Sequence, residues 1–435
     1  MDWLGQVPEH WQALPCRAIV HERTARNDGA KCEDYLSLMA NVGIIPYADK
    51  GDVGNKKPED LSKCKIVTPG DFVINSMNYG IGSYGLSDYD GVCSPVYIVL
   101  KPQNNVVESR FAFRIFENRA FQTYAQSFGN GILEHRCSIN WDILKQIGVG
   151  VPPLDEQKSI LSFLDRETAK IDALVAEQQR LMELLKEKRQ AVISHAVTKG
   201  LNPNAPLKPS GIEWLGDVPA HWDVKPVKFI AKIGNGSTPS REIPEYWTGG
   251  TYPWLNSSVV NLDSVVEAEQ FVTERALEEC HLPIITPPAV LVGITGQGRT
   301  RGMATMLLVE ATINQHVAYL KPNSTSIDVF FLRRVFDLTY VYLRRDSEEG
   351  GSTKGAITCE QIGNLKIAIP PQAEQKEINS HMDRVSKDFD ILTAEAQRAI
   401  DLLQERRSAL ISAAVTGQID VRHGAPVSQP ALRER

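Results

Sequence analysis

The sequence predicts an α+β protein made of two similar halves, because two phrases occur twice in the same order. The phrase from Trp3 to Trp11 (WLGQVPEHW) returns from Trp214 to Trp222 (WLGDVPAHW). A second phrase, VPPLDEQK from Val151, returns as IPPQAEQK from Ile369, and ISHAVT from Ile193 returns at the same offset as ISAAVT from Ile411. Repeats this long indicate two copies of a whole unit rather than a solenoid of short ones. We therefore expect two similar modules, each followed by a long helix.

Each module, residues 1–152 and residues 201–369 with their linker, has the pattern of short strands and a few short helices. Runs of β-branched and aromatic residues at 71–74, 96–100, 289–292 and 317–320 are separated by Gly, Pro, Asn and Ser turns. The modules align only in patches, so we expect a common scaffold with divergent loops. Residues 201–211 read as a semi-rigid linker, and the tail 422–435 is expected to be disordered.

The two long helices are expected at residues 153–200 and 370–421. Each follows a double proline and carries acidic residues in its first turn, which suit the helix macrodipole. Apolar residues then recur at spacings of four and three, and the expected seam is Ile160, Leu164, Ile171, Leu174, Leu181, Leu185, Val192, Ile378, Met382, Phe389, Leu392, Leu403 and Leu410. The matched frames favour pairing of the helices with each other. The alternative is that each helix is amphipathic and covers its own module, although a helix from 155 to 197 would be about 65 Å long.

The composition of the 435 residues, with 42% hydrophobic and 23% charged side chains, is ordinary for a globular protein. The 7 cysteines include no metal-ligand spacing, which indicates reduced thiols in a reducing cytoplasm. No stretch reads as a signal peptide or a membrane span, so we expect a cytoplasmic protein. The net charge of −6 disfavours non-specific nucleic-acid binding, which depends on phosphate neutralisation. Any DNA binding must therefore come from locally placed basic residues or be shared with a partner.

The chain resembles the specificity subunit of type I restriction-modification enzymes over nearly its whole length. The resemblance is carried by the doubled Trp-Leu-Gly-x-Val-Pro-x-His-Trp and the doubled Pro-Pro-x-x-Glu-Gln-Lys, each of the latter followed by a heptad helix and Ile-Ser-x-Ala-Val-Thr. The second module adds the phrase Gly236-Ser237-Thr238-Pro239, with Tyr246-Trp247 and Pro253-Trp254. Lys208 to Glu213 precede the second tryptophan phrase, whereas the first begins at Met1-Asp2. We expect that a short leader is missing from the first copy or that the start codon is misassigned.

The resemblance implies two target recognition domains, each reading half of a bipartite site on double-stranded DNA. It also implies that the two conserved helices form an antiparallel coiled-coil pair, in a pseudo-twofold, circular arrangement, and dock two methylation subunits and the restriction/translocase subunits. The chain would be a non-catalytic DNA-binding subunit of a phage-defence system, with no cofactor of its own and no membrane contact. S-adenosylmethionine, ATP and Mg would belong to the partner subunits.

In the first module, Gly80 to Gly85 fits G-x-G-x-x-G, but the helix and the acidic residue that a dinucleotide site needs do not follow. Such a loop also suits close approach of the backbone to DNA, and amides and hydroxyls near it are of types that pair with base edges. The candidate DNA-binding residues are Asn75, Asn78, Tyr79, Ser83 and Tyr84. The alternative is a surface hairpin without a ligand.

The same stretch of the second module runs from Gly296 to Gly302, and its arginines are suited to bidentate contact with guanine or phosphate. The candidates here are Gln297, Arg299, Thr300 and Arg301. Arg136 and Lys354 both precede the strand that leads to a long helix, so we expect them to position phosphates, or else to be solvated charges. Ser352 and Thr353 join Lys354 as candidates.

Two further groups of residues have structural as well as functional interpretations. Asn314-Gln315-His316 can satisfy turn backbone or read bases. His10 and His221 lie between Pro and Trp in the doubled phrase, where packing is favoured over catalysis. The sequence has no recognisable Ser, His and Asp set, and no Asn-Pro-Pro-Tyr run of the kind that holds a flipped adenine. The rival interpretations are a coiled-coil scaffold without DNA recognition and an enzyme acting alone.

Overall fold

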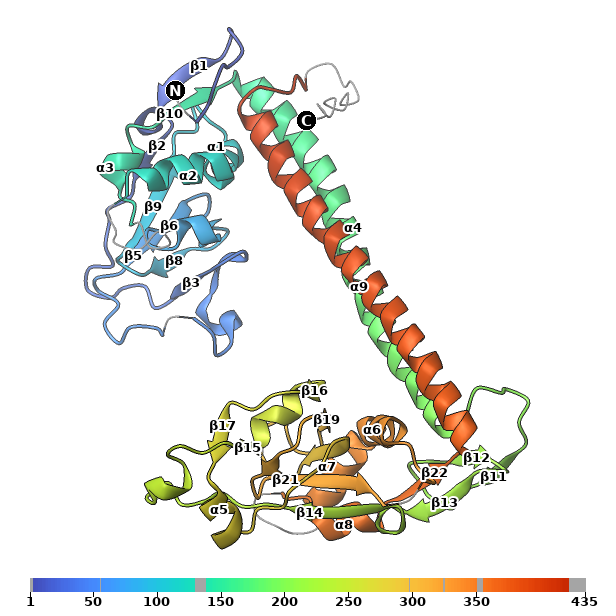
Figure 1. Ribbon diagram of the computed structural model, residues 1–435. Coiled ribbons are helices and arrows are strands. Elements are labelled where there is room, and N and C mark those ends of the chain that lie inside the picture. The colour runs from blue at the N-terminus through green and yellow to red at the C-terminus, as the bar shows by residue number, and fades with distance from the viewer. Residues whose placement is uncertain are drawn as a thin grey trace. The chain divides into compact units, whose positions relative to one another are not determined.

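The computed structural model describes residues 3–54, 56–129, 138–296, 298–323, 325–349 and 355–421 (Figure 1). The chain forms two compact units, one made of residues up to Arg180 together with those from Ala396, and the other of Leu181–Glu395. Each unit holds one module and a part of each long helix, α4 (Leu154–Lys199, 46 residues) and α9 (Gln372–Val415, 44 residues). In the described part of the chain, no helix is long and apolar enough to cross a membrane.

The first module is built on a four-stranded antiparallel sheet in the order β2-β9-β6-β7. Short two-stranded ladders, β1-β10, β3-β4 and β5-β8, surround this sheet. The elements are β1 (Gln12–Pro15), η1 (Cys16–Ala18), β2 (Val20–Glu22), β3 (Leu36–Met39), β4 (Gly43–Pro46), η2 (Tyr47–Lys50), β5 (Lys65–Val67), β6 (Phe72–Asn75), η3 (Tyr79–Ile81), β7 (Tyr84–Leu86), β8 (Gly91–Cys93), β9 (Tyr97–Pro102), α1 (Ser109–Glu117), α2 (Arg119–Ser127), α3 (Trp141–Leu144) and β10 (Gly148–Val151).

The second module repeats this sheet as β14-β21-β18-β19 and extends it with β16. Equivalent strands pair in equivalent register, because Phe72 faces Leu100 in the first sheet and Val290 faces Leu320 in the second. The elements are β11 (Leu207–Pro209), β12 (Asp217–Pro219), β13 (Asp223–Pro226), η4 (Val227–Phe229), β14 (Ala231–Asn235), η5 (Pro244–Tyr246), β15 (Tyr252–Leu255), η6 (Ser257–Asn261), β16 (Ser264–Val265), β17 (Gln270–Val272), α5 (Glu274–Glu279), β18 (Ala289–Gly293), β19 (Ala304–Leu307), β20 (Thr312–Ile313), β21 (Val317–Pro322), α6 (Val329–Leu338), α7 (Tyr340–Glu349), α8 (Cys359–Asn364) and β22 (Lys366–Ile369). The expectation of a common scaffold is thus confirmed at the level of strand order.

The largest hydrophobic cluster of each unit takes in the start of one long helix and the end of the other. In the first unit, Ile160 and Leu164 of α4 join Ile411 and Val415 of α9 against the module. The second unit has the matching set, in which Ile378 and Met382 of α9 join Ala196 and Val197 of α4. The repeated Ile-Ser-x-Ala-Val-Thr phrase therefore ends each helix by packing it into a module core.

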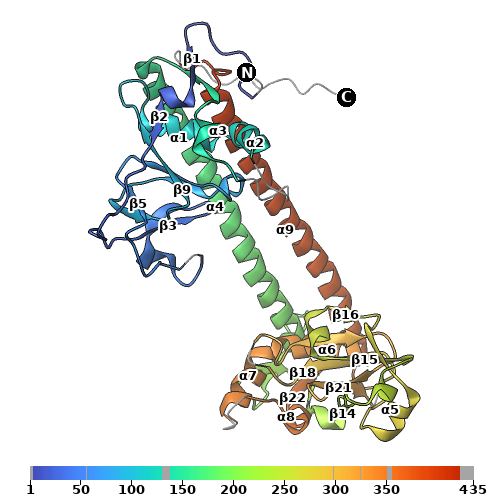
Figure 2. The same cartoon turned by 90° about the vertical axis from the view of Figure 1, so that its left-hand side faces the viewer.

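Within each unit the two helices run antiparallel and side by side (Figures 1 and 2). Arg407 Nε donates to Asp172 Oδ1 at 3.0 Å in the first unit, and Arg189 Nη1 donates to Asp390 Oδ1 at 2.6 Å in the second. Between the first ion pair and the second, the residue number on α4 increases and the residue number on α9 decreases by the same amount. Both units therefore use the same antiparallel register. The predicted antiparallel pair is confirmed.

The middle of the predicted seam is wrong by one residue. Leu174, Leu181 and Leu392 are 46%, 42% and 45% exposed. On α4 the half-buried positions are instead Val175, Gln178 and Met182, and on α9 the expected Leu392 is replaced by the half-buried Thr393. From Leu164 to Val175, as from Met382 to Thr393, the buried strip follows the 11-residue repeat of a nearly straight helix, about 3.67 residues per turn, rather than the 3.5 of a heptad. The same shift occurs in both copies.

Candidate nucleic-acid interface

The doubled tryptophan phrase and the doubled Glu-Gln pair meet in a joint between each module and its helix. His10 Nε2 donates to Glu156 Oε2 at 2.7 Å, and Trp11 Nε1 donates to Glu156 Oε1 at 3.0 Å. In the second unit His221 and Trp222 donate in the same way to Glu374 Oε2, at 2.8 and 3.0 Å. One carboxylate thus holds both rings, and each histidine positions the module.

The glutamine that follows each of these glutamates satisfies buried backbone groups. Gln157 is 0% exposed, accepts from Glu108 N at 2.8 Å, and donates to the carbonyls of Val106 and Pro152 at 3.0 and 2.8 Å. Gln375 is also 0% exposed and makes the matching bonds to Asp328 N and to the Ser326 and Pro370 carbonyls. A buried amide with all three bonds made is costly to replace. The Glu-Gln pair that the two copies share therefore fixes each module rigidly to its long helix.

The predicted DNA-binding loops lie at equivalent ends of the two sheets. The loop after β6, residues 76–83, lies beside the turn before β9, because Asn75 pairs with Tyr97. The loop after β18, residues 294–303, lies beside the turn before β21, because Gly293 pairs with Val317. The end of each sheet therefore carries two adjacent loops on the same strands, and the two modules differ in the length and side chains of these loops.

Three of the first-module candidates are buried, which the prediction of direct DNA contacts did not anticipate. Asn75, Tyr79 and Ser83 are 6%, 0% and 4% exposed. Tyr79 donates its hydroxyl proton to the Phe116 carbonyl at 2.5 Å, and the Asn75 amide oxygen accepts from Met77 N at 3.2 Å. Burial raises the pKa of Tyr79 well above its usual range. These side chains shape the loop from inside the module.

Two candidates of this loop remain partly accessible. Tyr84 is half-buried and packs edge-on against the rings of Phe72 and Tyr79, and burial raises the pKa of its hydroxyl. Asn78 is half-buried. Asn41, which the sequence analysis missed, is exposed and donates its backbone N–H to the Gly82 carbonyl at 2.9 Å. Its φ of 61° is an αL turn conformation that Asn tolerates, so Asn-x-Gly at 41–43 was the available signal.

In the second module Arg301 is buried, which the prediction of a DNA contact did not anticipate. Its side chain is 5% exposed and its Nη2 donates to Glu348 Oε1 of α7 at 2.5 Å. A Cβ at Gly355 would overlap the end of the Arg301 side chain, so Gly355 lies against the guanidinium. Arg301 therefore fastens the loop to the module.

Arg299 is exposed on the same loop, and Thr300 is half-buried. Two side chains of α7 hold the loop backbone: Tyr340 donates to the Arg299 carbonyl at 3.0 Å, and Arg344 donates to the Gly298 carbonyl at 2.7 Å. The Arg299 guanidinium is thus presented on a fixed backbone, as a phosphate or base contact requires. The candidates Gln297, Arg136, Ser352, Thr353 and Lys354 lie outside the described residues.

The residues of the Asn314-Gln315-His316 triplet have different roles: the first forms a turn, and the other two belong to a polar network. Asn314 is 5% exposed and accepts from His316 N at 2.9 Å, which is a turn role. Thr238 Oγ1 donates to Gln315 Oε1 at 2.8 Å, and Gln315 Nε2 donates to His316 Nε2 at 3.2 Å. Because Nε2 of His316 accepts, its Nδ1 carries the proton that Thr295 Oγ1 accepts at 2.8 Å. Thr238 belongs to the Gly-Ser-Thr-Pro phrase, so that phrase supplies one end of this network.

A second exposed cation of this module is held by aromatic rings. The Arg241 guanidinium lies 3.6 Å from the ring centroid of Trp247 and 5.7 Å from that of Trp254. Its Nη2 also donates to Gln270 Oε1 at 2.5 Å. Stacking and this bond restrict the guanidinium while leaving it at the surface, which suits a phosphate contact.

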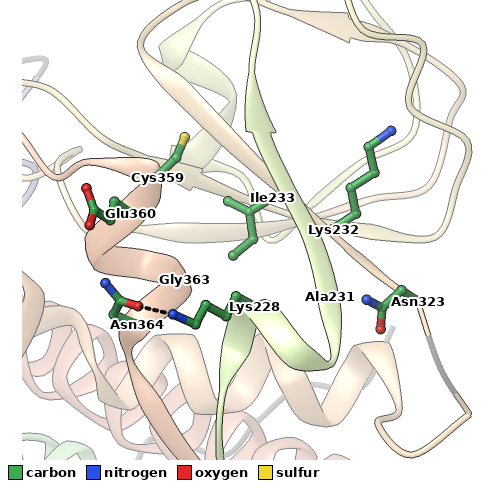
Figure 3. A pocket seen from close by; sticks show the side chains of 9 residues that line it. All are labelled: Lys228, Ala231, Lys232, Ile233, Asn323, Cys359, Glu360, Gly363 and Asn364. Carbon is green, nitrogen blue, oxygen red and sulfur yellow. Dashed lines mark hydrogen bonds between the residues drawn. The ribbon is translucent and has the colours of Figure 1, made fainter.

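A shallow hollow beside β14 and α8 has no catalytic arrangement (Figure 3). Lys228 Nζ donates to Asn364 Oδ1 at 2.8 Å across it, and Lys232 and Cys359 also line it. Burial raises the pKa of the Cys359 thiol, which disfavours a nucleophilic thiolate. Across the described residues, no group of three or more His, Cys, Asp and Glu side chains is placed to hold a metal ion.

Duplicated modules with divergent loops on a shared helix pair define a recognition protein with two binding surfaces on one chain. The family described as type I restriction modification DNA specificity domain matches residues 31–183 and 219–401. These segments make up more than half of the chain, and the chain therefore belongs to this family.

Relatives and solved structures of the same length agree with this assignment. The putative type I restriction enzyme MjaX specificity subunit of Methanocaldococcus jannaschii is 22% identical over 96% of each chain. The EcoKI specificity subunit of Escherichia coli is 21% identical, over 95% of this chain and 90% of that one. The fold is similar to that of the HsdS subunit of Thermoanaerobacter tengcongensis, with a TM-score of 0.55, 17% identity, and 95% and 98% of the two chains covered. A chain from a study of type I R-M complex assembly gives 0.63 at 18% identity, covering 95% and 100%.

Proposed function

We propose that this chain is the DNA-recognition subunit of a type I restriction-modification system, and that each module reads one half of a bipartite target. The observation that carries the proposal is the contrast at equivalent loops. Both modules have the same strand order and the same glutamate joint, yet the second presents Arg299 and a Thr-Gln-His network where the first presents other chemistry. One scaffold with two loop chemistries fits a target with two different halves.

In this proposal the reacting groups belong to partner subunits, which would bind S-adenosylmethionine, ATP and Mg. This chain would position the partner subunits on the DNA. The joints at Glu156 and Glu374 fix each reading loop relative to the start of its helix, through bonds of 2.7 to 3.0 Å. A partner docked on the helices would thereby be held in a set position on its half-site.

The helix pair offers equivalent docking surfaces for two copies of one methylation subunit. In the first unit Leu174 and Leu402 are 46% and 59% exposed, and in the second unit Leu392 and Leu184 are 45% and 51% exposed. The offset that relates the two Glu-Gln phrases also relates Leu392 to Leu174 and Leu402 to Leu184, so each unit exposes the same pair of positions. Exposed leucines scattered singly are ordinary, but the recurrence of these leucines at equivalent positions in the two units favours a protein contact. Duplicated leucine pairs favour one partner copy per unit.

Co-expression with the methylation subunit tests the docking. We expect a complex of one copy of this chain and two partners by native mass spectrometry. Leu174→Ser with Leu402→Ser should remove one partner, and Leu184→Ser with Leu392→Ser should remove the other, whereas Val341→Ser, at a residue 72% exposed in the second module, serves as the matched control. Loss of both partners from either pair alone would contradict the two-site arrangement.

DNA recognition is tested with the same complex. We expect a mapped methylation pattern with two fixed half-sequences separated by a non-specific spacer, and binding to that duplex that weakens steeply with salt. Binding without sequence preference, or no binding by the complex at any salt concentration, would favour an interaction scaffold and overturn the proposal.

A further inference from the structure

Four exposed apolar side chains gather at the reading end of the first module. Val42, Met77, Ile81 and Val96, here named the apolar tip, are 67%, 51%, 59% and 57% exposed. They come from the β3-β4 turn, the loop after β6 and the turn before β9. Hydrogen bonds tie these segments together, from Asn41 N to the Gly82 carbonyl at 2.9 Å and from Ser76 Oγ to the Val96 carbonyl at 3.4 Å. The segments that carry the four side chains therefore lie next to one another.

Three positions of the apolar tip have polar equivalents in the second module. Counted from the paired strand ends Asn75 and Gly293, Met77 corresponds to Thr295. The second loop is two residues longer, because Asn75 N donates to the Ser83 carbonyl whereas Gly293 N donates to the Met303 carbonyl, and counted back from those carbonyls Ile81 corresponds to Arg301. Counted back from Tyr97 and Val317, which start β9 and β21, Val96 corresponds to His316.

This asymmetry separates the apolar tip from the docking surfaces. Two copies of one partner need two equivalent surfaces. The leucine pairs on the helices are equivalent, whereas the apolar tip has no counterpart among the residues that the structure describes in the second module. A ligand that requires apolar chemistry at one module and hydrogen bonds at the other, on one backbone frame, must itself differ between its halves. A bipartite DNA target does so.

The apolar tip fits one group that DNA displays in its major groove. Thymine carries a 5-methyl group there, and apolar side chains contact it, whereas guanine and adenine present acceptors that Arg and amide side chains read. Met77 and Ile81 lie on a loop that is fixed against the module, because Gly80 packs on the Gln126 side chain and Gly82 packs on the Asn41 side chain. Asn41, beside Val42, adds an exposed amide of the type that pairs with adenine.

We propose that the first module recognises thymine through the apolar tip, with Met77, Ile81 and Val96 packed on 5-methyl groups of its half-site. The second module reads its half-site through the hydrogen-bonding groups of Thr295 and Arg299, and His316 holds Thr295 and Gln315 in place. This inference rests on the proposed function and adds the base chemistry of the first half-site. The half-site assigned to residues 1–152 then contains thymine at the contacted positions.

The test replaces thymine by deoxyuridine, which lacks the methyl group and keeps the pairing bonds. The assembled complex is titrated at fixed salt with duplexes of its mapped target, substituted in one half-site at a time. Substitution in the first half-site should weaken binding about fourfold for each contacted methyl group, and substitution in the second should change it less than twofold. A first half-site without thymine, or equal affinity for the uracil duplex, would overturn the inference.

A variant series assigns the effect to these residues. In the complex with Met77→Ala, Ile81→Ala and Val96→Ala, the uracil and thymine duplexes should bind equally, whereas Val53→Ala, at a valine 60% exposed outside the tip, should keep the difference. A difference that persists in the triple variant would place the methyl contact elsewhere and overturn the assignment. Loss of a partner subunit from the triple variant, with no uracil effect in the native complex, would make the tip a protein contact. Absence of any bipartite preference in the native complex would instead count against the proposed function.

Discussion

Arg299 and Arg301 occupy one loop, separated by a single threonine, and the structure assigns them opposite roles. Arg301 is buried against Glu348, whereas Arg299 is exposed on a backbone held by Tyr340 and Arg344. We expect Arg301→Ala to lower the free energy of unfolding of the second unit. Arg299→Ala should leave that stability unchanged and weaken DNA binding at one half-site.

The sizes of the two effects follow from exposure. Arg301→Ala removes a buried hydrogen bond to a charged group, worth about 1.5 to 3 kcal/mol. The Glu348 side chain is 60% exposed and regains water, so the lower end of that range is expected. Arg299→Ala is a surface change, within about 0.5 kcal/mol for stability. Its lost contact should cost about 1 to 3 kcal/mol of binding for a base, or reduce the salt slope by about one for a phosphate.

Two assays separate these outcomes. Denaturant unfolding followed by a signal from the second unit measures stability, and titration of the assembled complex with its mapped duplex measures affinity. Arg301→Met retains much of the buried side-chain volume and distinguishes loss of packing from loss of the ion pair. The reasoning is refuted if Arg301→Ala unfolds like the native chain while DNA affinity falls, or if Arg299→Ala leaves both affinity and salt dependence unaltered.

Three further predictions concern the joints, the helices and the stacked arginine. Glu374→Ala should destabilise the second unit by about 1 to 3 kcal/mol, because the indole N–H of the buried Trp222 loses its acceptor. Glu156→Ala should do the same in the first unit, and denaturant unfolding curves equal to that of the native chain would contradict this role. Four residues inserted after Gln178 and after Ala396 lengthen both helices by about 6 Å, so the mapped target should keep its half-sequences and gain one or two spacer base pairs, at about 3.4 Å each; changed half-sequences with a fixed spacer would show that the helices take part in base reading. Arg241→Ala should lower affinity alike for cognate and non-cognate duplexes, as a phosphate contact does, whereas a loss confined to the cognate duplex would indicate base contact.

The doubled phrases were sufficient to predict the two modules, the long helices and their pairing. The Glu-Gln phrase at the head of each helix required the same joint twice, and the structure has it twice, at Glu156 and Glu374. What each residue of the joint does was not predictable. Glutamine at 157 and 375 reads as a polar helix residue in sequence, and only tertiary packing brings it to the carbonyls and amides that it satisfies.

The sequence determined the periodicity of the helices but not the residue at which the buried strip shifts. Both Leu174 and Val175 are apolar, so pattern alone cannot choose between a heptad and an 11-residue step. The choice depends on how straight the helices are when their two ends pack into module cores. The strip therefore passes through Val175 and Thr393, and the exposed leucines become candidates for partner contact.

The reading loops show the same division between sequence and tertiary structure. Residue type marked the glycine-flanked loops as places for polar and basic contacts, and among the candidates there Arg299 is exposed, as a contact with DNA would require. Burial distinguishes the other candidates. Tyr79 and Arg301 are of residue types that contact DNA, but the Tyr79 hydroxyl donates to the Phe116 carbonyl and the Arg301 guanidinium donates to Glu348 of the same module. Sequence specifies which groups a loop contains. Only the packing of the loop against its sheet and helices determines which of those groups remain at the surface to meet DNA, since burial depends on neighbours that lie far away along the chain.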